Sequence, residues 1–117
     1  MKTGQWVADA FGKHLFTETL VSGAGAAQTT VTWVKMPADW DIASLHVVIT
    51  GTATVVIYST NEPGFADGAA PGNAINESGT LSATGQVIVL GPKDAIGFAI
   101  PTWASGAVSI HLRATKK

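Results

Sequence analysis

The stretch from Leu45 to Thr60, LHVVITGTATVVIYST, constrains the fold of this chain more than any other. Two runs rich in Val, Ile and Thr flank a Thr-Gly-Thr break centred on Gly51. Residues branched at Cβ fit the pleated surface of a sheet, and glycine can adopt the positive φ of a tight turn. The pattern therefore predicts a β-hairpin, with apolar residues on both faces that place it centrally in a sheet.

The remaining sequence predicts further strands rather than helices. Short segments alternate between apolar and polar residues and end at Gly or Pro, which interrupt sheet ladders. Outside the hairpin, these segments are 15–21, 28–36, 85–90, 95–100 and 106–114, with a short one beginning near Leu81. The sequence predicts an all-β protein of about seven or eight strands, an antiparallel β-sandwich of jelly-roll type. We expect an N-terminal arm over residues 1–14 and a single sandwich domain over residues 15–117.

Composition narrows the kinds of partner. Only 13% of the 117 residues are charged and the net charge is −1, so we expect no binding to nucleic acid or to an anionic membrane. No apolar run approaches the roughly 20 residues that span a bilayer. The absence of Cys excludes a disulfide-stapled scaffold. Low charge is consistent with surfaces covered by neighbouring copies, and equally with a neutral sandwich kept in solution by Thr, Ser and Asn.

No pattern of catalytic or metal-binding residues stands out. The histidines, His14, His46 and His111, have no metal-ligand spacing, and His46 and His111 alternate with core positions and should point outward. The Asp39-Trp40-Asp41 run lacks the remaining ligands and the Gly of a calcium loop. Nucleophile elbows and phosphate-binding loops are also absent from the sequence. We therefore predict no enzyme activity, no catalytic residues, no cofactor and no bound metal.

Five aromatic residues are the candidates for partner binding. Trp6 and Phe11 lie on the N-terminal arm, and Phe65 lies in the long loop from Asn61 to Thr80, which we expect to extend in part onto a partner. Trp40 and Trp103 fall in turns among small and polar residues, where they could stack on a sugar or a protein. The alternative is that these two tryptophans cap the ends of the sandwich.

Three segments together resemble small virion proteins of tailed bacteriophages. They are GTATVVIYSTNEPG with the glycine-rich loop after it, GQVIVLGPKDAIGFAI, and GAVSIHLRA. The resemblance covers roughly residues 43 to 114 and is one of overall pattern. It implies a capsid decoration (cement) protein, or another head or tail component, without catalytic residues. Such proteins assemble as oligomers, often trimers, on the major capsid protein or another virion protein after synthesis in the cytoplasm of the host bacterium.

The sequence thus predicts a structural virion protein that docks through its N-terminal arm and self-associates through apolar faces. The alternative is a carbohydrate-binding or receptor-binding module on a phage tail or a similar appendage, with a glycan as its partner.

Overall fold

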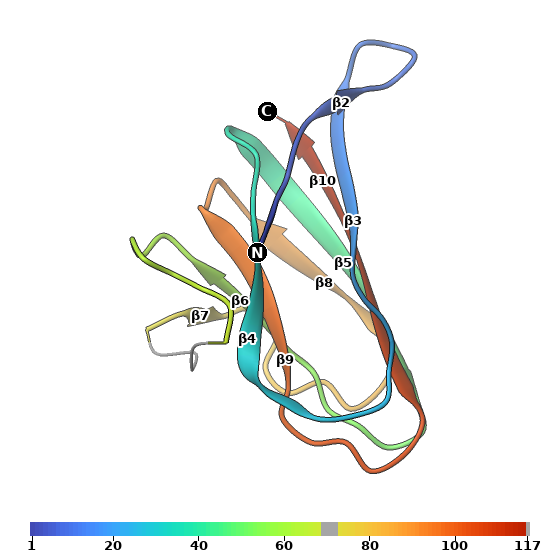
Figure 1. Ribbon diagram of the computed structural model, residues 1–117. Helices are drawn as coiled ribbons and strands as arrows, with labels where there is room; N and C mark the ends of the chain where they lie inside the picture. Colours follow the sequence, from blue (N-terminus) through green and yellow to red (C-terminus); the bar gives the residue numbers. More distant parts are fainter. Residues whose placement is uncertain (69–72, 117) are drawn as a thin grey trace.

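A computed structural model describes residues 1–68 and 73–116, and these form an all-β protein. Within these residues, ten strands build two five-stranded sheets, sheet A in the order β1-β4-β9-β6-β7 and sheet B in the order β2-β3-β10-β5-β8 (Figure 1). The bounds are β1 Lys2–Thr3, β2 Val7–Ala8, β3 His14–Ala24, β4 Gln28–Lys35, β5 Trp40–Thr50, β6 Val56–Thr60, β7 Ile75–Asn76, β8 Gly85–Leu90, β9 Ala95–Ile100 and β10 Ala107–Lys116. Within these ranges, no helix has the length and apolar character needed to cross a bilayer.

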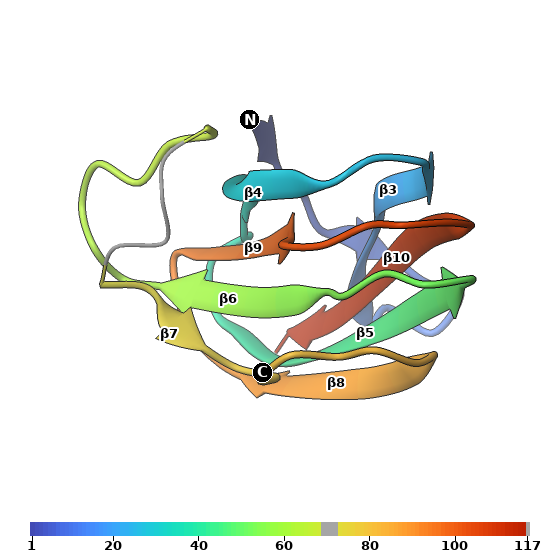
Figure 2. The ribbon, with the colours of Figure 1, turned by 90° about the horizontal axis from the view of Figure 1, so that it is seen from below.

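The strand pairing confirms the predicted jelly roll. Strand β3 pairs with β10, β4 with β9, β5 with β8 and β6 with β7, all antiparallel. The chain is therefore one long hairpin, folded at the connection between β6 and β7 and rolled into two sheets. Further pairs, β5 with β10 and β6 with β9, join the rolled layers into continuous sheets. In Figure 2, strands β4, β9 and β6 of sheet A lie side by side.

The short hairpin predicted at Leu45–Thr60 is wrong. Strand β5 belongs to sheet B and β6 to sheet A, so the Thr-Gly-Thr break carries the chain from one sheet to the other. Gly51 does have a positive φ, of 82°. The crossing is favoured because Val47 of one sheet and Ile57 of the other then pack in the same core between the sheets. In a hairpin, both residues would belong to the same sheet.

The core fills the space between the inner faces of the two sheets. The strand alternation predicted its members on β9 and β10, and those residues are buried as expected. The largest fully buried side chains are Trp40, Phe98, Leu45, Ile57, Ile96, Ile100, Ile110, Leu112, Val31, Val34, Val47 and Val55. Strands β5, β8 and β10 of sheet B contribute alternate residues, which is the pattern of a sheet with one wet face. Strand β9 of sheet A is buried at every position.

The outer face of sheet A is covered by the chain itself. Trp33, Ala95 and Ala99 form a second buried cluster there, and Phe65 from the long loop packs against it. Gly97 makes room for this layer, because a Cβ atom at that position would lie 2.6 Å from the Trp33 ring. The small residues of β9 therefore contact a cover formed by the same chain.

The N-terminal arm lies along one side of the sandwich and contacts both sheets. Strand β1 adds to β4 in parallel, and β2 adds to β3 in antiparallel fashion. Between them, the Gly4 N–H donates to the Lys35 carbonyl at 2.6 Å, and Gly4 lies so close to Phe16 that a Cβ atom would approach its ring to 2.7 Å. The arm therefore covers the start of β3 and the end of β4.

Candidate functional site

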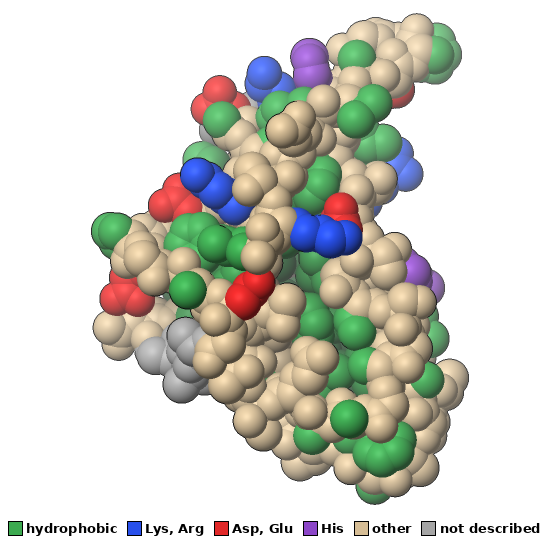
Figure 3. All heavy atoms as spheres, viewed as in Figure 1, with side chains coloured by type: hydrophobic (Ala, Val, Ile, Leu, Met, Phe, Trp, Pro, Cys, Tyr) green, Lys and Arg blue, Asp and Glu red, His purple; other side chains and the backbone are tan. Residues whose placement is uncertain are grey.

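The β2–β3 hairpin projects from the body and carries an exposed aromatic side chain at its tip. Phe11 is 90% exposed, the highest value among the large hydrophobic residues of the described ranges. In Figure 1 this hairpin extends beyond the rest of the sandwich, and in Figure 3 hydrophobic atoms lie at the end of the same projection. Exposed aromatic side chains on projecting loops are typical anchors of protein interfaces.

The tip is held in one conformation by hydrogen bonds within the loop. An Asp9 carboxylate oxygen accepts the backbone N–H groups of Phe11 at 2.8 Å and Lys13 at 2.9 Å. The Asp9 N–H donates to the Lys13 carbonyl at 2.7 Å, and Gly12 turns the chain with a φ of 78°. Because these contacts fix the loop, little further ordering of its backbone is needed when Phe11 meets a partner.

Trp6 anchors the base of the same hairpin. Its indole N–H donates to the Ala38 carbonyl at 2.8 Å, and the ring packs on the main core and meets His14 edge-on at 6.4 Å between centroids. Trp6 is half-buried, so it serves to attach the arm to the body. Of the two aromatic residues predicted on the arm, Phe11 is the one whose whole ring is available to a partner.

Phe65 and the first part of the long loop fold back on sheet A. The Phe65 ring meets Trp33 edge-on at 5.9 Å, and an Asp67 carboxylate oxygen accepts the Trp33 N–H at 2.6 Å. The Gly68 N–H donates to the Val31 carbonyl. This part of the loop is thus packed on its own body, and the part of the Asn61–Thr80 prediction that concerns residues 69–72 lies outside the described residues.

Trp40 is not available to a partner in this fold. It begins β5, is only 1% exposed, and its indole N–H donates to the Lys93 carbonyl at 2.7 Å. The Gly91 backbone packs so closely on the ring that a Cβ atom there would lie 2.6 Å from it. We therefore remove Trp40 from the candidate binding residues, because its turn-like neighbours in sequence concealed a core position.

Trp103 is less exposed than Phe11 and less buried than Trp40. It is half-buried, packs against the main core, and its indole N–H donates to the Gly106 carbonyl at 3.1 Å. An isolated bridge to Ala53 ties its backbone to the crossing between β5 and β6. These contacts match the capping role that the sequence left open, with part of the ring still at the surface.

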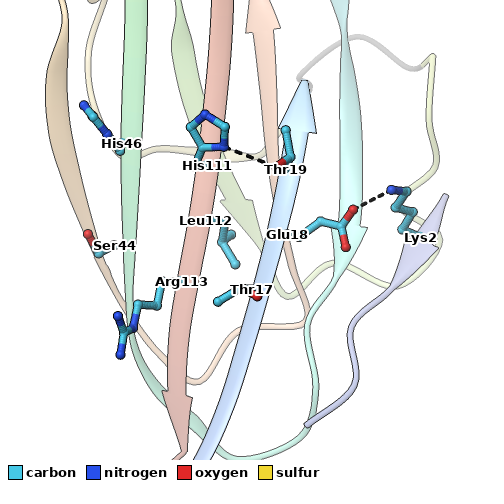
Figure 4. Close-up of a pocket in the computed structure, with 9 residues that line it drawn as sticks. All are labelled: Lys2, Thr17, Glu18, Thr19, Ser44, His46, His111, Leu112 and Arg113. Atoms are coloured by element: carbon cyan, nitrogen blue, oxygen red, sulfur yellow. Dashed lines mark hydrogen bonds and ion pairs between the residues drawn. The ribbon is translucent and has the colours of Figure 1, made fainter. Parts of the chain in front are cut away.

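The outer face of sheet B carries a shallow hollow of about 610 Å³. His46 on β5 and His111 on β10 are directly opposite each other and both exposed, as the alternation predicted, with 6.5 Å between ring centroids (Figure 4). Thr19 on β3 lies 3.2 Å from Nδ1 of His111, and Arg113 lines the hollow further along β10. No group of three or more metal-ligating side chains occurs among residues 1–68 and 73–116.

A partly buried ion pair fastens the segment after β7 to the loop before β9. Lys93 contacts a Glu77 oxygen at 2.5 Å, and Ser59 donates to the same oxygen at 2.6 Å. Partial burial alone would raise the pKa of the Glu77 carboxyl, but the hydrogen bonds from Lys93 and Ser59, with the Lys93 charge, lower it below its usual value. Its contacts identify this pair as a structural fastening. Lys93 also lines a surface hollow of about 480 Å³, together with Asn61 and Asp94.

One further surface was missed by the sequence reasoning. Ile42 on β5 faces Leu90 on β8, and Ile88 lies on the same outer face, with exposed fractions of 40%, 64% and 49%. The alternation of GQVIVL predicted a strand at this position, yet both of its faces are apolar. Sequence alone could not say that β8 lies at the edge of a sheet.

Comparisons with known proteins identify no family for this chain. No family model matches the sequence, and no curated protein matches it. One similar solved structure comes from Bacillus endospore appendages, described as a novel family of disulfide-linked pili. It is 15% identical, with a TM-score of 0.44 over 90% of this chain and 91% of that chain. A likeness this distant supports no argument about function, so the proposals below rest on the residues of this chain.

Proposed function

We propose that this chain is a non-enzymatic structural protein of a bacteriophage particle, of the capsid decoration (cement) type. The observation that carries the proposal is Phe11, an almost fully exposed aromatic side chain on a hairpin tip held by hydrogen bonds. The resemblance of residues 43 to 114 to small virion proteins supplies the setting, with the major capsid protein or another virion protein as the partner.

The arm is suited to docking on a broad surface. Phe11 projects away from the body, while Trp6 fixes the base of the hairpin against the core. An exposed aromatic ring that enters a pocket of a partner gains much of the binding free energy of an interface, and a fixed loop loses little conformational entropy in the process. In this proposal the β2–β3 hairpin binds the partner, and it holds the sandwich at the partner's surface.

The surface composition favours many copies packed closely together. With 13% charged residues and a net charge of −1, neighbouring copies repel one another weakly. In Figure 3 the lowest third of the visible face shows no acidic or basic side chain. Self-association through apolar faces follows, and the virion setting favours a trimer, which the mass in solution tests.

The docking proposal is tested by replacing Phe11 with Ser in the intact chain. We expect the affinity for capsids assembled from the major capsid protein of the same phage to fall roughly tenfold or more, because an aromatic anchor is lost. Co-sedimentation of labelled protein with the capsids measures the affinity, and circular dichroism confirms the fold. Ile75→Ser is the matched control, since Ile75 is also exposed and lies on β7, away from the arm. Equal binding by Phe11→Ser and the unaltered chain would refute docking through the arm.

The carbohydrate-binding alternative is less well supported by the geometry. Of its two tryptophans, Trp40 is buried in the core and Trp103 is half-buried with its N–H already bonded. A sugar-stacking platform needs an open aromatic face. The described aromatic side chains offer such a face only at Phe11.

A further inference from the structure

Strand β8 forms a six-residue sheet edge that no other strand covers in the described part of the chain. The four edge strands are β1 and β7 of sheet A and β2 and β8 of sheet B. Three of them have two residues each, whereas β8 has six. Short edge strands are a common protection against pairing with other chains, and β8 lacks it. In Figure 2, β8 lies along the lower margin of the molecule with no strand beyond it.

The backbone of β8 presents unpaired groups along this edge. The Gly91 N–H donates to the Asp41 carbonyl at 2.7 Å, and the register then directs the odd-numbered residues of β8 toward β5. The N–H and C=O groups of Gln86, Ile88 and Leu90 are therefore directed away from the sheet. A strand that added here would accept and donate hydrogen bonds at these three residues.

The side chains of β8 lack the usual protection against pairing. The segment GQVIVL contains no charged residue, no proline and no bulge, and Ile88 and Leu90 are exposed on its outer face. Ile42 on β5 widens this apolar strip by facing Leu90. Uncharged, β-prone edges of this length pair readily with a second strand of the same kind.

We propose that β8 pairs with β8 of a second copy in antiparallel fashion, which joins two B sheets into one ten-stranded sheet across a two-fold axis. The outward groups fix the register: Ile88 faces Ile88 of the second copy, and Gln86 faces its Leu90. The residue pairs are then Gln86 with Leu90, Ile88 with Ile88, and Leu90 with Gln86. In each pair the backbone N–H and C=O groups point toward the other copy, which gives about six backbone hydrogen bonds. The two Ile88 side chains meet at the axis, and the apolar strips of both copies become one surface.

This inference rests on the self-association in the proposed function and specifies how it occurs. The contact uses the same surface on both copies, so it closes as a dimer and cannot by itself build the trimer that the virion setting favours. It is independent of the hairpin tip, because Phe11 lies on the arm beside β3 and β8 is at the opposite edge of sheet B.

The test introduces a charged side chain at the two-fold axis of the proposed dimer, in the intact chain. Ile88→Lys places two like charges opposite each other, so we expect the dimer dissociation constant to rise roughly tenfold or more in analytical ultracentrifugation. Ile75→Lys is the matched control, because Ile75 has the same 49% exposure on the edge of sheet A. We expect that variant to dimerise as the unaltered chain does.

A mixture of variants tests the register itself. Ile88→Lys and Ile88→Glu should each dimerise more weakly than the unaltered chain when alone and should form a tighter mixed dimer when combined, because opposite charges then face each other. An unchanged dissociation constant in Ile88→Lys, or a mixture that associates no more tightly than either variant alone, would overturn the β8 interface and leave self-association standing. A chain that is monomeric at every concentration would overturn both, while docking through Phe11 would still be decided by the capsid-binding assay.

Discussion

At the scale of single residues, two glycines control the crossing between the sheets. Gly51 follows the end of β5 and Gly106 precedes the start of β10. Both have a positive φ, and their backbones lie in contact with each other. A Cβ atom on Gly106 would lie 1.7 Å from the Thr50 carbonyl oxygen, and one on Gly51 would lie 2.6 Å from the Ser105 oxygen. No side chain can be accommodated at Gly106 without displacing backbone.

We therefore expect Gly106→Ala to lower the free energy of unfolding by about 3 kcal/mol or more, because both the backbone conformation and the steric overlap are unfavourable. Gly23→Ala is the control: its φ is also positive, at 64°, but no atom lies within 4 Å of an added Cβ. It should cost about 1–2 kcal/mol from the backbone conformation alone. Urea denaturation measures both values, and equal losses would contradict the steric argument.

At the scale of the elements, the ion pair of Glu77 and Lys93 holds the segment after β7 against the loop before β9. Because the pKa of the Glu77 carboxyl is lower in the folded chain than in the unfolded one, folding favours its ionised form. The stabilisation is therefore complete above the ordinary glutamate pKa, near 4.5, and is lost as the pH falls through the lower folded value.

Glu77→Gln should remove this contribution. We expect a loss of about 1–3 kcal/mol at pH 7, because Lys93 is left partly buried without its partner. The loss relative to the unaltered chain should shrink as the pH falls below about 4.5. Thermal unfolding over a pH series measures the difference, with Glu62→Gln, in the loop before β7, as the control. A difference that stays constant with pH would show that the charge of Glu77 does not matter.

The elements also show where prediction from sequence succeeds and where it fails. Alternation identified the strands β4, β8, β9 and β10. For β10 it also identified the buried side, because burial of one face of a strand produces a period of two. For β9 it could not, because both faces of that strand are buried. It failed at Gly51, since a tight turn between two apolar strands has the same local sequence in a hairpin and in a crossing between sheets. Trp40 was assigned to a turn for a related reason: the residues that bury it, Gly91 and Lys93, are far away in sequence.

At the scale of the whole molecule, the jelly roll itself does not decide function. The same architecture serves in viral shells, in lectins and in enzymes, so an argument about function has to come from the surfaces. Here the two sides of the sandwich differ. One side is closed by the arm, which ends in Phe11, and the other exposes the edge of β8. A molecule with a projecting aromatic tip at one edge and an open strand at the other can bind a surface and a second copy simultaneously.

The arm also belongs to the stability of the molecule, which changes how its role has to be tested. Removing residues 1–13 would delete β1 and β2, expose the edges of β4 and β3, and uncover the Phe16 ring that Gly4 packs against. We expect the truncated chain to unfold at lower urea concentration and to aggregate through its open edges. Light scattering and urea denaturation measure both effects.

Phe11→Ser keeps every backbone contact of the arm, because the Asp9 carboxylate binds the N–H of residue 11 whatever its side chain. It should therefore match the unaltered chain in both stability assays while losing capsid binding. If the truncated chain were as stable as the full chain, the arm would be an appendage that contributes nothing to the sandwich. The loss of binding on truncation could then be assigned to docking alone. If it is less stable, as the edge pairing of β1 and β2 implies, only the point substitution separates docking from folding.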